Sequence, residues 1–217
     1  MTVHLQNYNL TYISIPKVAC TSLKHYFYEL ENGQSFTPAQ PGNQYATTIH
    51  RHAKSIPFSN LDPHKMMGHK VIAVVRDPWK RILSCYADKV VHRKALHDVE
   101  FSTKQAALGM VADPSLDNFI DLLAHYRAAS PLIRHHSQPL SFFLGTNPTF
   151  YDRIFSLRQL PELIEYIGTI VPDAPQIKYL NRRTAKKVSP SQEQIKRNRP
   201  YLEAAFREDI DLYGAFF

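Results

Sequence analysis

Apolar and polar positions along the chain follow strand and helix patterns in turn. Residues 10–15 alternate apolar and polar side chains in a β-rich run, which predicts a strand that ends at Pro16. Residues 71–75, VIAVV, form a continuous apolar run, typical of a strand that helices cover on both faces. Residues 153–157 predict a further strand.

Apolar residues at helical spacing follow each of these strands. The helices that this spacing predicts run from about 21 to 30, from 78 to 90, around 117–126, from 161 to about 170, and from about 191 to 213. Thr21 or Ser22 is expected to cap the first helix and Asp77 the second, and Pro200 is expected to kink or split the last. Strands that alternate with helices predict an α/β fold with a mainly parallel central sheet flanked by helices.

Length and composition are those of one ordinary globular domain spanning residues 1–217. Residues 32–64 predict a long irregular segment, which inside a compact domain is usually functional. The two cysteines, Cys20 and Cys85, make no disulfide framework and have no zinc-ligand spacing. The sequence begins with no secretory signal and contains no apolar run of membrane-spanning length, so a cytoplasmic protein is expected.

The net charge of +7 and the pI near 9.4 indicate an anionic partner. Nucleic acid is one such partner, but no motif of a nucleic-acid reader is present, and we expect none to be bound. Basic residues are spread along the chain apart from one late cluster, which a solvated surface would also explain. That cluster contains Arg182, Arg183, Lys186 and Lys187.

The segment from Ile15 to Ser22 links the first expected strand to the first expected helix. Backbone N–H groups in such a loop, together with the helix dipole, favour an anion at the helix start. Lys17 adds a full positive charge, and Thr21 and Ser22 add hydroxyl donors. The glycines of a Walker A loop are missing, which disfavours a nucleotide-hydrolysing P-loop enzyme. A turn with a purely structural role is the alternative interpretation.

A second element runs from Val75 to Tyr86. Arg76 follows the apolar strand at its carboxyl end, where open α/β sheets bind ligands. Ser84 comes eight residues later, just over two helical turns along, so both side chains could converge on one phosphate. The alternative is an Arg76 paired with Asp77 and a solvated Ser84.

Together the two elements resemble those of the sulfotransferases that use 3′-phosphoadenosine-5′-phosphosulfate (PAPS), in the branch that sulfates carbohydrates. The first matches I-P-K-x-x-x-T-S/N, and the second matches V-R-D/E-P-x-x-R-L-x-S-x-Y. Later segments are similar to further elements of the chondroitin and heparan 2-O-type enzymes: residues 151–164, 180–187 and 189–214. The chain departs at Ala19 and Cys20, where many members have small residues such as glycine.

The resemblance implies a P-loop-like sulfotransferase fold and assigns roles to the matching residues. The 5′-phosphosulfate would be held by Lys17, Thr21, Ser22 and the backbone of Ala19 and Cys20. Arg76 and Ser84 would bind the 3′-phosphate, and Arg182, Arg183 and Thr184 would close over the nucleotide.

The resemblance also points to the base that deprotonates the acceptor. Heparan 2-O-type enzymes carry an H-x-H element between the two cofactor motifs, and one of its histidines is the base. Here that element is His50-Arg51-His52, with His52 at the favoured position and His50 as the alternative. His135 and His136 fall where relatives have an acceptor-site element, but its tryptophan is absent here.

The expected reaction is an in-line displacement at sulfur, with Lys17 neutralising charge on the leaving 5′-phosphate and no metal required. The acceptor is expected to be a hydroxyl of a carbohydrate or glycoconjugate, with a non-sugar hydroxyl as the alternative. Two other classes stay open on the residues alone: a nucleotide kinase that uses the same strand–loop–helix cradle, and a non-catalytic polyanion-binding module.

Overall fold

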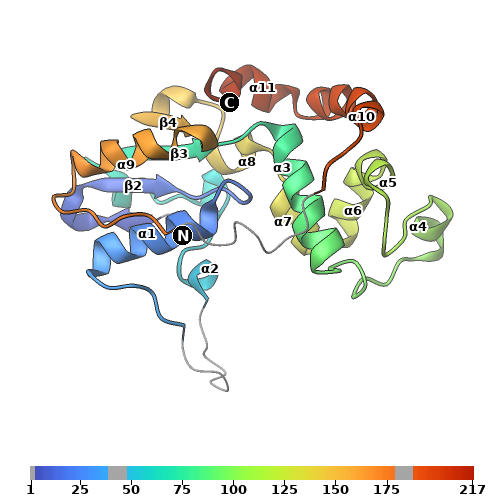
Figure 1. Cartoon of the computed structure of the whole chain (residues 1–217), viewed down its shortest axis with the longest axis horizontal. Helices are drawn as coiled ribbons and strands as arrows, with labels where there is room; N and C mark the ends of the chain where they lie inside the picture. Colours follow the sequence, from blue (N-terminus) through green and yellow to red (C-terminus); the bar gives the residue numbers. More distant parts are fainter. Residues whose placement is uncertain (1–2, 39–47, 179–187) are drawn as a thin grey trace. The chain divides into compact units, whose positions relative to one another are not determined.

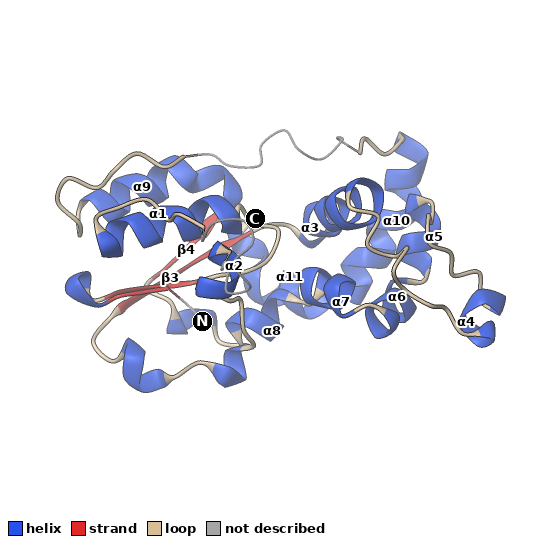
Figure 2. Ribbon diagram, turned by 90° about the horizontal axis from the view of Figure 1, so that it is seen from below, coloured by secondary structure: helices blue, strands red, loops and turns tan. Residues whose placement is uncertain are grey.

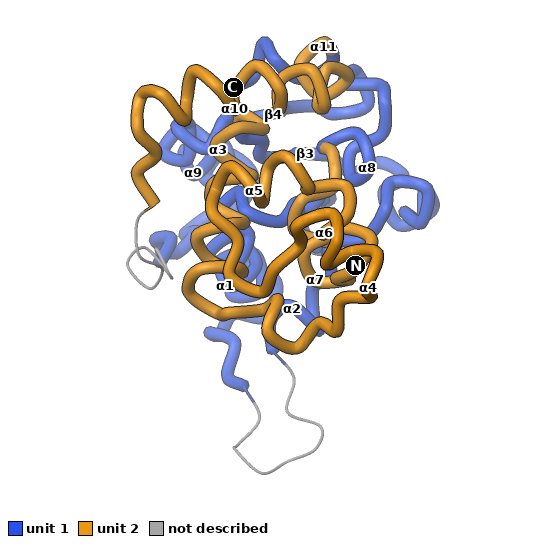
Figure 3. Tube along the Cα trace, turned by 90° about the vertical axis from the view of Figure 1, so that its right-hand side faces the viewer, with its two compact units in different colours: residues 1–76, 140–182, 212–217 blue, residues 77–139, 183–211 orange. Residues whose placement is uncertain are grey.

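The computed structural model describes residues 3–38, 48–178 and 188–217. Contacts divide the chain into two compact units, which Figure 3 colours separately. The first unit contains residues 1–76, 140–182 and 212–217, and the second contains residues 77–139 and 183–211. Each unit has its own buried apolar cluster, so each is described by itself.

The first unit is built on a four-stranded sheet in the order β1-β2-β3-β4. Its strands are β1 (Val3–Leu5), β2 (Leu10–Ile13), β3 (Lys70–Val75) and β4 (Arg153–Ser156). β1 runs antiparallel to β2, whereas β2, β3 and β4 are mutually parallel. The α/β class and the mainly parallel sheet are therefore confirmed, and β1 is an addition that the apolar pattern had not predicted.

Helices cover the sheet of the first unit. α1 (Cys20–Asn32) and α9 (Leu160–Gly168) lie on one face, and α8 (Leu140–Leu144) lies on the other (Figures 1 and 2). The short helix α2 (Ile49–His52) follows the irregular segment after α1. Because β3 is covered on both faces, residues 71–75 are all buried, which explains the unbroken apolar run. In the same core Tyr12 stacks on Phe27 with ring centroids 4.7 Å apart.

The second unit is helical over its described residues. Its helices are α3 (Pro78–Cys85), a π-helical turn (Tyr86–His92), α4 (Thr103–Ala107), α5 (Leu116–Asp121), α6 (Leu123–Ala129), α7 (Pro131–Ser137) and α10 (Gln192–Ala205). α11 (Arg207–Tyr213) starts in this unit and ends in the first. Inside it, the fully buried Arg81 donates to the Gln138 carbonyl at 2.7 Å and lies 3.9 Å from the buried Asp209 carboxylate.

Helix ends agree with the sequence in some places and differ in others. Asp77 caps α3 by accepting from the N–H of Lys80, as expected, and Ser191 caps α10 by accepting from the N–H of Gln194. The expected single helix around 117–126 is interrupted at Leu122, whose φ of −105° and ψ of 19° leave the helical region.

The last helical region is interrupted at a different residue from the one expected. α10 continues through Pro200, and the chain leaves the helix at Phe206 instead, with φ −116° and ψ 30°. A proline removes one N–H from the helix, and α10 includes Pro200 without ending there. Over the described residues, the helices are too short or too polar to cross a bilayer.

Candidate functional site

The two sequence motifs meet where neighbouring parallel strands end. Lys17 follows β2 and Arg76 follows β3, and these strands are paired over residues 10–13 and 70–73. The Nη1 of Arg76 donates to the carbonyl oxygen of Lys17 at 3.3 Å. Two residues 59 positions apart in sequence therefore share one edge of the sheet, the edge at which open α/β folds bind ligands.

The turn between β2 and α1 has an unusual backbone. Lys17 and Ala19 both adopt left-handed conformations, with φ of 70° and 58°. Such conformations cost a non-glycine residue about 1 kcal/mol or more and gather at functional sites. Alternation between left-handed and other conformations directs successive N–H groups into a concave anion-binding surface.

The start of α1 corrects one expectation from the sequence. The cap of α1 is Ala19, which makes no side-chain cap hydrogen bond, so Thr21 and Ser22 are not caps. The left-handed turn brings the chain into the helix at Cys20, one residue before the first expected cap. Both hydroxyls therefore lie in the first turn, beside the N–H groups that no capping side chain satisfies. A helix of thirteen residues that begins in this way favours an anion at its N-terminus.

The two candidate histidines of α2 have different surroundings. The Nε2 of His50 lies 3.1 Å from the hydroxyl of Thr21, on the first turn of α1. The ring of His52 packs instead against aromatic rings, 5.0 Å from Tyr28 and 6.0 Å from Phe36 between centroids. We call the turn and helix start over residues 15–22 the cradle. Of the two histidines, His50 is therefore the one that contacts the cradle, through Thr21.

Behind His50 lies a buried lysine that the sequence had not singled out. The Nζ of Lys24 is 3.4 Å from His50 Nδ1 and 3.3 Å from the hydroxyl of Ser55. Ser55 in turn lies 3.1 Å from the hydroxyl of Ser14, at the end of β2. Lys24 is only 2% exposed, and this burial lowers its pKa from the ordinary lysine value.

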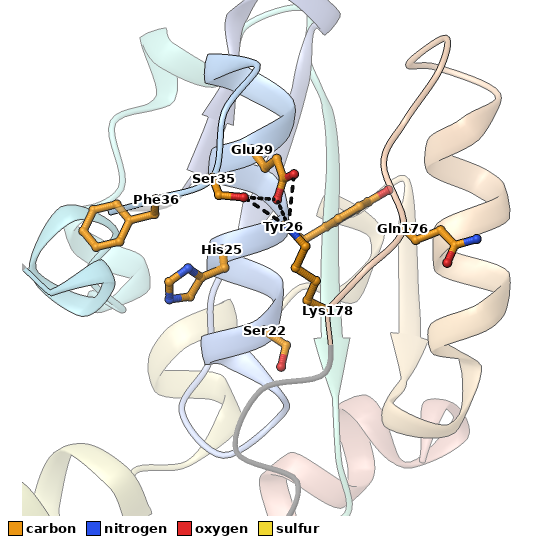
Figure 4. Close-up of a pocket in the computed structure, with 8 residues that line it drawn as sticks. All are labelled: Ser22, His25, Tyr26, Glu29, Ser35, Phe36, Gln176 and Lys178. Atoms are coloured by element: carbon orange, nitrogen blue, oxygen red, sulfur yellow. Dashed lines mark hydrogen bonds and ion pairs between the residues drawn. The ribbon is translucent and has the colours of Figure 1, made fainter. Parts of the chain in front are cut away.

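A pocket of about 180 Å³ opens on a neighbouring stripe of α1. Figure 4 shows its lining, which comes from α1, from the segment after α1 and from the segment after α9. Residues spaced three and four apart share a helix face, so α1 presents one stripe to this pocket and another to α2. The lining residues are Ser22, His25, Tyr26, Glu29, Ser35, Phe36, Gln176 and Lys178.

Polar contacts join the pocket walls. The Lys178 ammonium lies 3.3 Å from the Glu29 carboxylate and 3.1 Å from the Ser35 hydroxyl, which also donates to Glu29 (Figure 4). Burial raises the pKa of Tyr26 to about 12, so its phenol stays protonated at neutral pH. Burial also lowers the pKa of His25, against the weaker opposing effect of Glu29.

The other expected site residues belong to the second unit or lie outside the described residues. Ser84 lies on α3 of the second unit, and its role at the 3′-phosphate stays a prediction. His135 and His136 lie on α7, with their rings 5.1 Å apart. The closing residues Arg182, Arg183 and Thr184 lie outside the described residues.

The sequence analysis missed Lys24, Ser55 and the pocket. Lys24 could have been noticed because it interrupts the apolar stripe between Leu23 and Tyr26 as a charged residue on the same helix. The serines carried no signal, since their pairing depends on a segment with no regular pattern. Over the described residues, no group of three or more acidic, histidine or cysteine side chains could hold a metal ion.

Comparison with known proteins identifies the family of the chain. The model of the sulfotransferase family matches residues 2–214, which is nearly the whole chain. The match includes both units and both motifs at the sheet edge. Searches of the curated proteins and of the solved structures give no match. From its near-complete match, the chain belongs to the sulfotransferase family and is an enzyme of sulfuryl transfer.

Proposed function

We propose that this enzyme transfers the sulfuryl group of PAPS to a hydroxyl of a carbohydrate or glycoconjugate. One observation carries the proposal: Arg76 donates to the carbonyl of Lys17, which joins the two cofactor motifs at one edge of the sheet. Arg76, Lys17 and the start of α1 therefore lie at the same edge of the sheet. A nucleotide with negative charge at both its 5′- and 3′-ends matches such a site.

The cradle residues stabilise charge where the reaction develops it. The acceptor oxygen attacks sulfur, the bond from sulfur to the 5′-phosphate oxygen breaks, and the electron pair stays on that phosphate. Lys17, the N–H groups of Ala19 and Cys20, and the hydroxyls of Thr21 and Ser22 hold that phosphate and the sulfuryl oxygens. Preorganised donors of this kind supply the largest share of the rate enhancement in many transfer enzymes.

His50 is the base in this proposal, in place of the favoured His52. Its Nε2 lies 3.1 Å from Thr21, so it is within reach of a hydroxyl placed beside the sulfuryl group. His52 is held by Tyr28 and Phe36, which supports a positioning role for its ring. Nε2 of His50 takes the acceptor proton as the new O–S bond forms.

The pocket beside Ser22 fits the base of the nucleotide. Tyr26 and Phe36 contribute aromatic side chains to its lining, and Gln176 offers both a donor and an acceptor. The pocket begins at Ser22, the residue proposed to hold the 5′-phosphosulfate, so a nucleotide could reach from the cradle into it. We place the adenine ring there, while Ser84, Arg182, Arg183 and Thr184 remain proposed contacts of the nucleotide on the strength of the motifs.

The test is release of adenosine 3′,5′-bisphosphate from PAPS in the presence of a panel of glycan acceptors and of non-sugar alcohols and phenols. We expect turnover without added metal and a rise in thermal stability on adding adenosine 3′,5′-bisphosphate, because ligands of the native state stabilise it. Turnover of the sugars alone supports the carbohydrate acceptor, and turnover of the phenols alone contradicts it.

Two further results contradict the proposal as a whole. Magnesium-dependent transfer from ATP would make the protein a kinase. Binding of RNA that weakens steeply with salt, together with no stabilisation by adenosine 3′,5′-bisphosphate, would make it a polyanion-binding module.

Lys17→Ala is expected to lower turnover by roughly 100-fold or more. Lys65→Ala is the matched control on an exposed lysine of the same unit.

A further inference from the structure

Lys24 occupies a position that the proposed reaction leaves unexplained. It is a lysine on the second turn of α1, 2% exposed, in a place where a helix packed on a sheet normally has an apolar side chain. Buried ammonium groups are normally paired with a carboxylate. The partners that the structure gives Lys24 are the imidazole of His50 and the hydroxyl of Ser55, and both are neutral when His50 is the free base.

The arrangement forms a chain of polar groups from the cradle into the core. It starts at Thr21, passes through both ring nitrogens of His50 to Lys24, and continues over Ser55 to Ser14. The Nε2 of His50 faces the cradle, and its Nδ1 faces Lys24. A charged Lys24 therefore excludes hydrogen on Nδ1 of a neutral His50, whereas a neutral Lys24 permits it.

Two arrangements are chemically allowed. An ammonium has three donors and no acceptor, so a charged Lys24 requires a bare Nδ1, and the hydrogen of neutral His50 then sits on Nε2. In that form Nε2 cannot take a proton from an acceptor hydroxyl. A neutral amine instead accepts from Nδ1–H and leaves Nε2 bare toward Thr21, which is the form that a base needs.

We propose that Lys24, as a neutral amine, is a positioning residue that holds the proton of His50 on Nδ1 and receives that proton when the acceptor hydroxyl is deprotonated. This inference rests on the proposed function. The transfer balances: the acceptor proton moves to Nε2, the Nδ1 proton moves to Lys24, and His50 ends neutral beside a new ammonium. No oxidant, metal or other co-reactant takes part.

Two physical arguments support the neutral amine in the resting enzyme. Burial disfavours the ammonium, and the lowered pKa of Lys24 has burial as its largest cause. The titratable groups that face Lys24 are Cys20 on its own helix and His50 on α2, and the serines that complete its surroundings carry no charge. Cys20 acts in the opposite direction only as far as its thiol ionises.

The reaction itself makes the ammonium more favourable at the right moment. Breaking the S–O bond leaves an additional negative charge on the 5′-phosphate, held at the start of α1, one to two turns from Lys24. A nearby anion stabilises a protonated amine. The negative charge that develops on the leaving phosphate therefore stabilises Lys24 as it receives the proton.

The experiment combines ¹⁵N NMR of the His50 ring with kinetics of two variants of the full chain. In the wild type at the pH of activity, we expect a neutral ring with hydrogen on Nδ1. Lys24→Arg places a permanent cation at the site, so we expect hydrogen on Nε2 and a fall in PAPS turnover of roughly 100-fold. Lys24→Met leaves the tautomer unrestrained, and we expect a smaller fall of about tenfold. If Lys24 acted only through a positive charge, Lys24→Arg would keep that charge and lose less turnover than Lys24→Met.

Folding and nucleotide binding are followed in parallel by thermal unfolding with and without adenosine 3′,5′-bisphosphate, with Lys65→Arg as the control. A wild-type ring with hydrogen on Nε2, or wild-type turnover in a folded Lys24→Arg protein, overturns the inference. The NMR measurement of the wild-type tautomer needs neither turnover nor a variant, so it tests the inference even if Lys24→Arg fails to fold. Failure of the proposed function has a different signature, namely no stabilisation of the wild type by the nucleotide.

Discussion

Arg76 and Lys17 are joined by one hydrogen bond, from the guanidinium Nη1 to the carbonyl oxygen at 3.3 Å. The bond makes Arg76 part of the turn that holds Lys17 in its left-handed conformation, in addition to its proposed contact with phosphate. Arg76→Lys keeps the charge and loses the planar fork that can serve both partners at once. We expect nucleotide affinity to fall about tenfold or more, measured by calorimetry with adenosine 3′,5′-bisphosphate.

The matched control for this change is Arg153→Lys on β4. Its guanidinium lies 4.9 Å from the centre of the Tyr166 ring, so the control also removes an arginine contact in the same unit. We expect its affinity for the nucleotide to match the wild type. Equal affinity in the Arg76→Lys and wild-type proteins would show that Arg76 does not touch the ligand.

The two histidines of α2 are separated by a pair of variants. His50→Ala is expected to lower kcat by roughly 100-fold, because it removes the base, while affinity for adenosine 3′,5′-bisphosphate changes little. His52→Ala removes a ring that packs on Tyr28 and Phe36, so we expect a smaller fall in kcat and a lower melting temperature. A larger kinetic loss in His52→Ala than in His50→Ala would restore His52 as the base.

Ala19 provides a test of the backbone of the cradle. Its φ of 58° is unfavourable for alanine and natural for glycine. We expect Ala19→Gly to leave stability unchanged or to raise it by up to about 1 kcal/mol, with nucleotide binding retained. Ala53→Gly is the control, since Ala53 is buried with φ −120°, and there we expect a loss of about 1 kcal/mol. Chemical denaturation measures both.

Much of the fold followed from local pattern. β3 is apolar over residues 71–75 because helices cover both of its faces. Asp77-Pro78 and Ser191 start helices through side-chain caps that short sequence segments specify. β1 escaped prediction because three residues with one fully buried side chain give too little periodicity. The end of α10 at Phe206, six residues beyond Pro200, is marked by no proline or glycine in the sequence.

The candidate site divides in the same way. Lys17 and Arg76 were recognisable because each follows a buried strand, and parallel strands bring their carboxyl ends together. Choosing between His50 and His52 required the direction in which each ring leaves a four-residue helix, and no sequence pattern carries that information. The position of Lys24 beside Leu23 was readable from the sequence, but its partners His50 and Ser55 depend on how α2 and the segment after it pack against α1.

The pocket on α1 predicts a preference among nucleotides. Gln176 provides one donor and one acceptor, and Glu29 provides an acceptor for an exocyclic amine such as that of adenine. We expect Gln176→Ala to weaken binding of adenosine 3′,5′-bisphosphate by about tenfold. The same change should leave inorganic phosphate binding unaltered, as measured by competition. The control is Gln159→Ala, in the turn that follows β4 and outside the pocket lining, and an equal loss there would place the base elsewhere.

Lys24 also predicts a cost in stability that varies with pH. Its pKa is lower in the folded protein than in the unfolded chain, so the folded state disfavours the ammonium. A group with a depressed pKa favours folding above its unfolded value and loses that contribution as pH falls. At neutral pH, therefore, the unfolded chain binds the lysine proton more strongly than the folded protein does, which lowers the stability of the native state.

Lys24→Met removes this penalty and fills the space with an apolar chain of similar length. We expect the variant to be more stable than the wild type by about 1 kcal/mol or more at pH 7, even though turnover falls. At pH 10 to 10.5 the gain should shrink, because the unfolded lysine then also becomes neutral. Urea unfolding at both pH values measures the difference, with Lys65→Met as an exposed control expected to change stability by less than about 0.5 kcal/mol. A variant less stable than the wild type at both pH values would mean that Lys24 stabilises the fold as a charged group, and its buried position would then need no functional explanation.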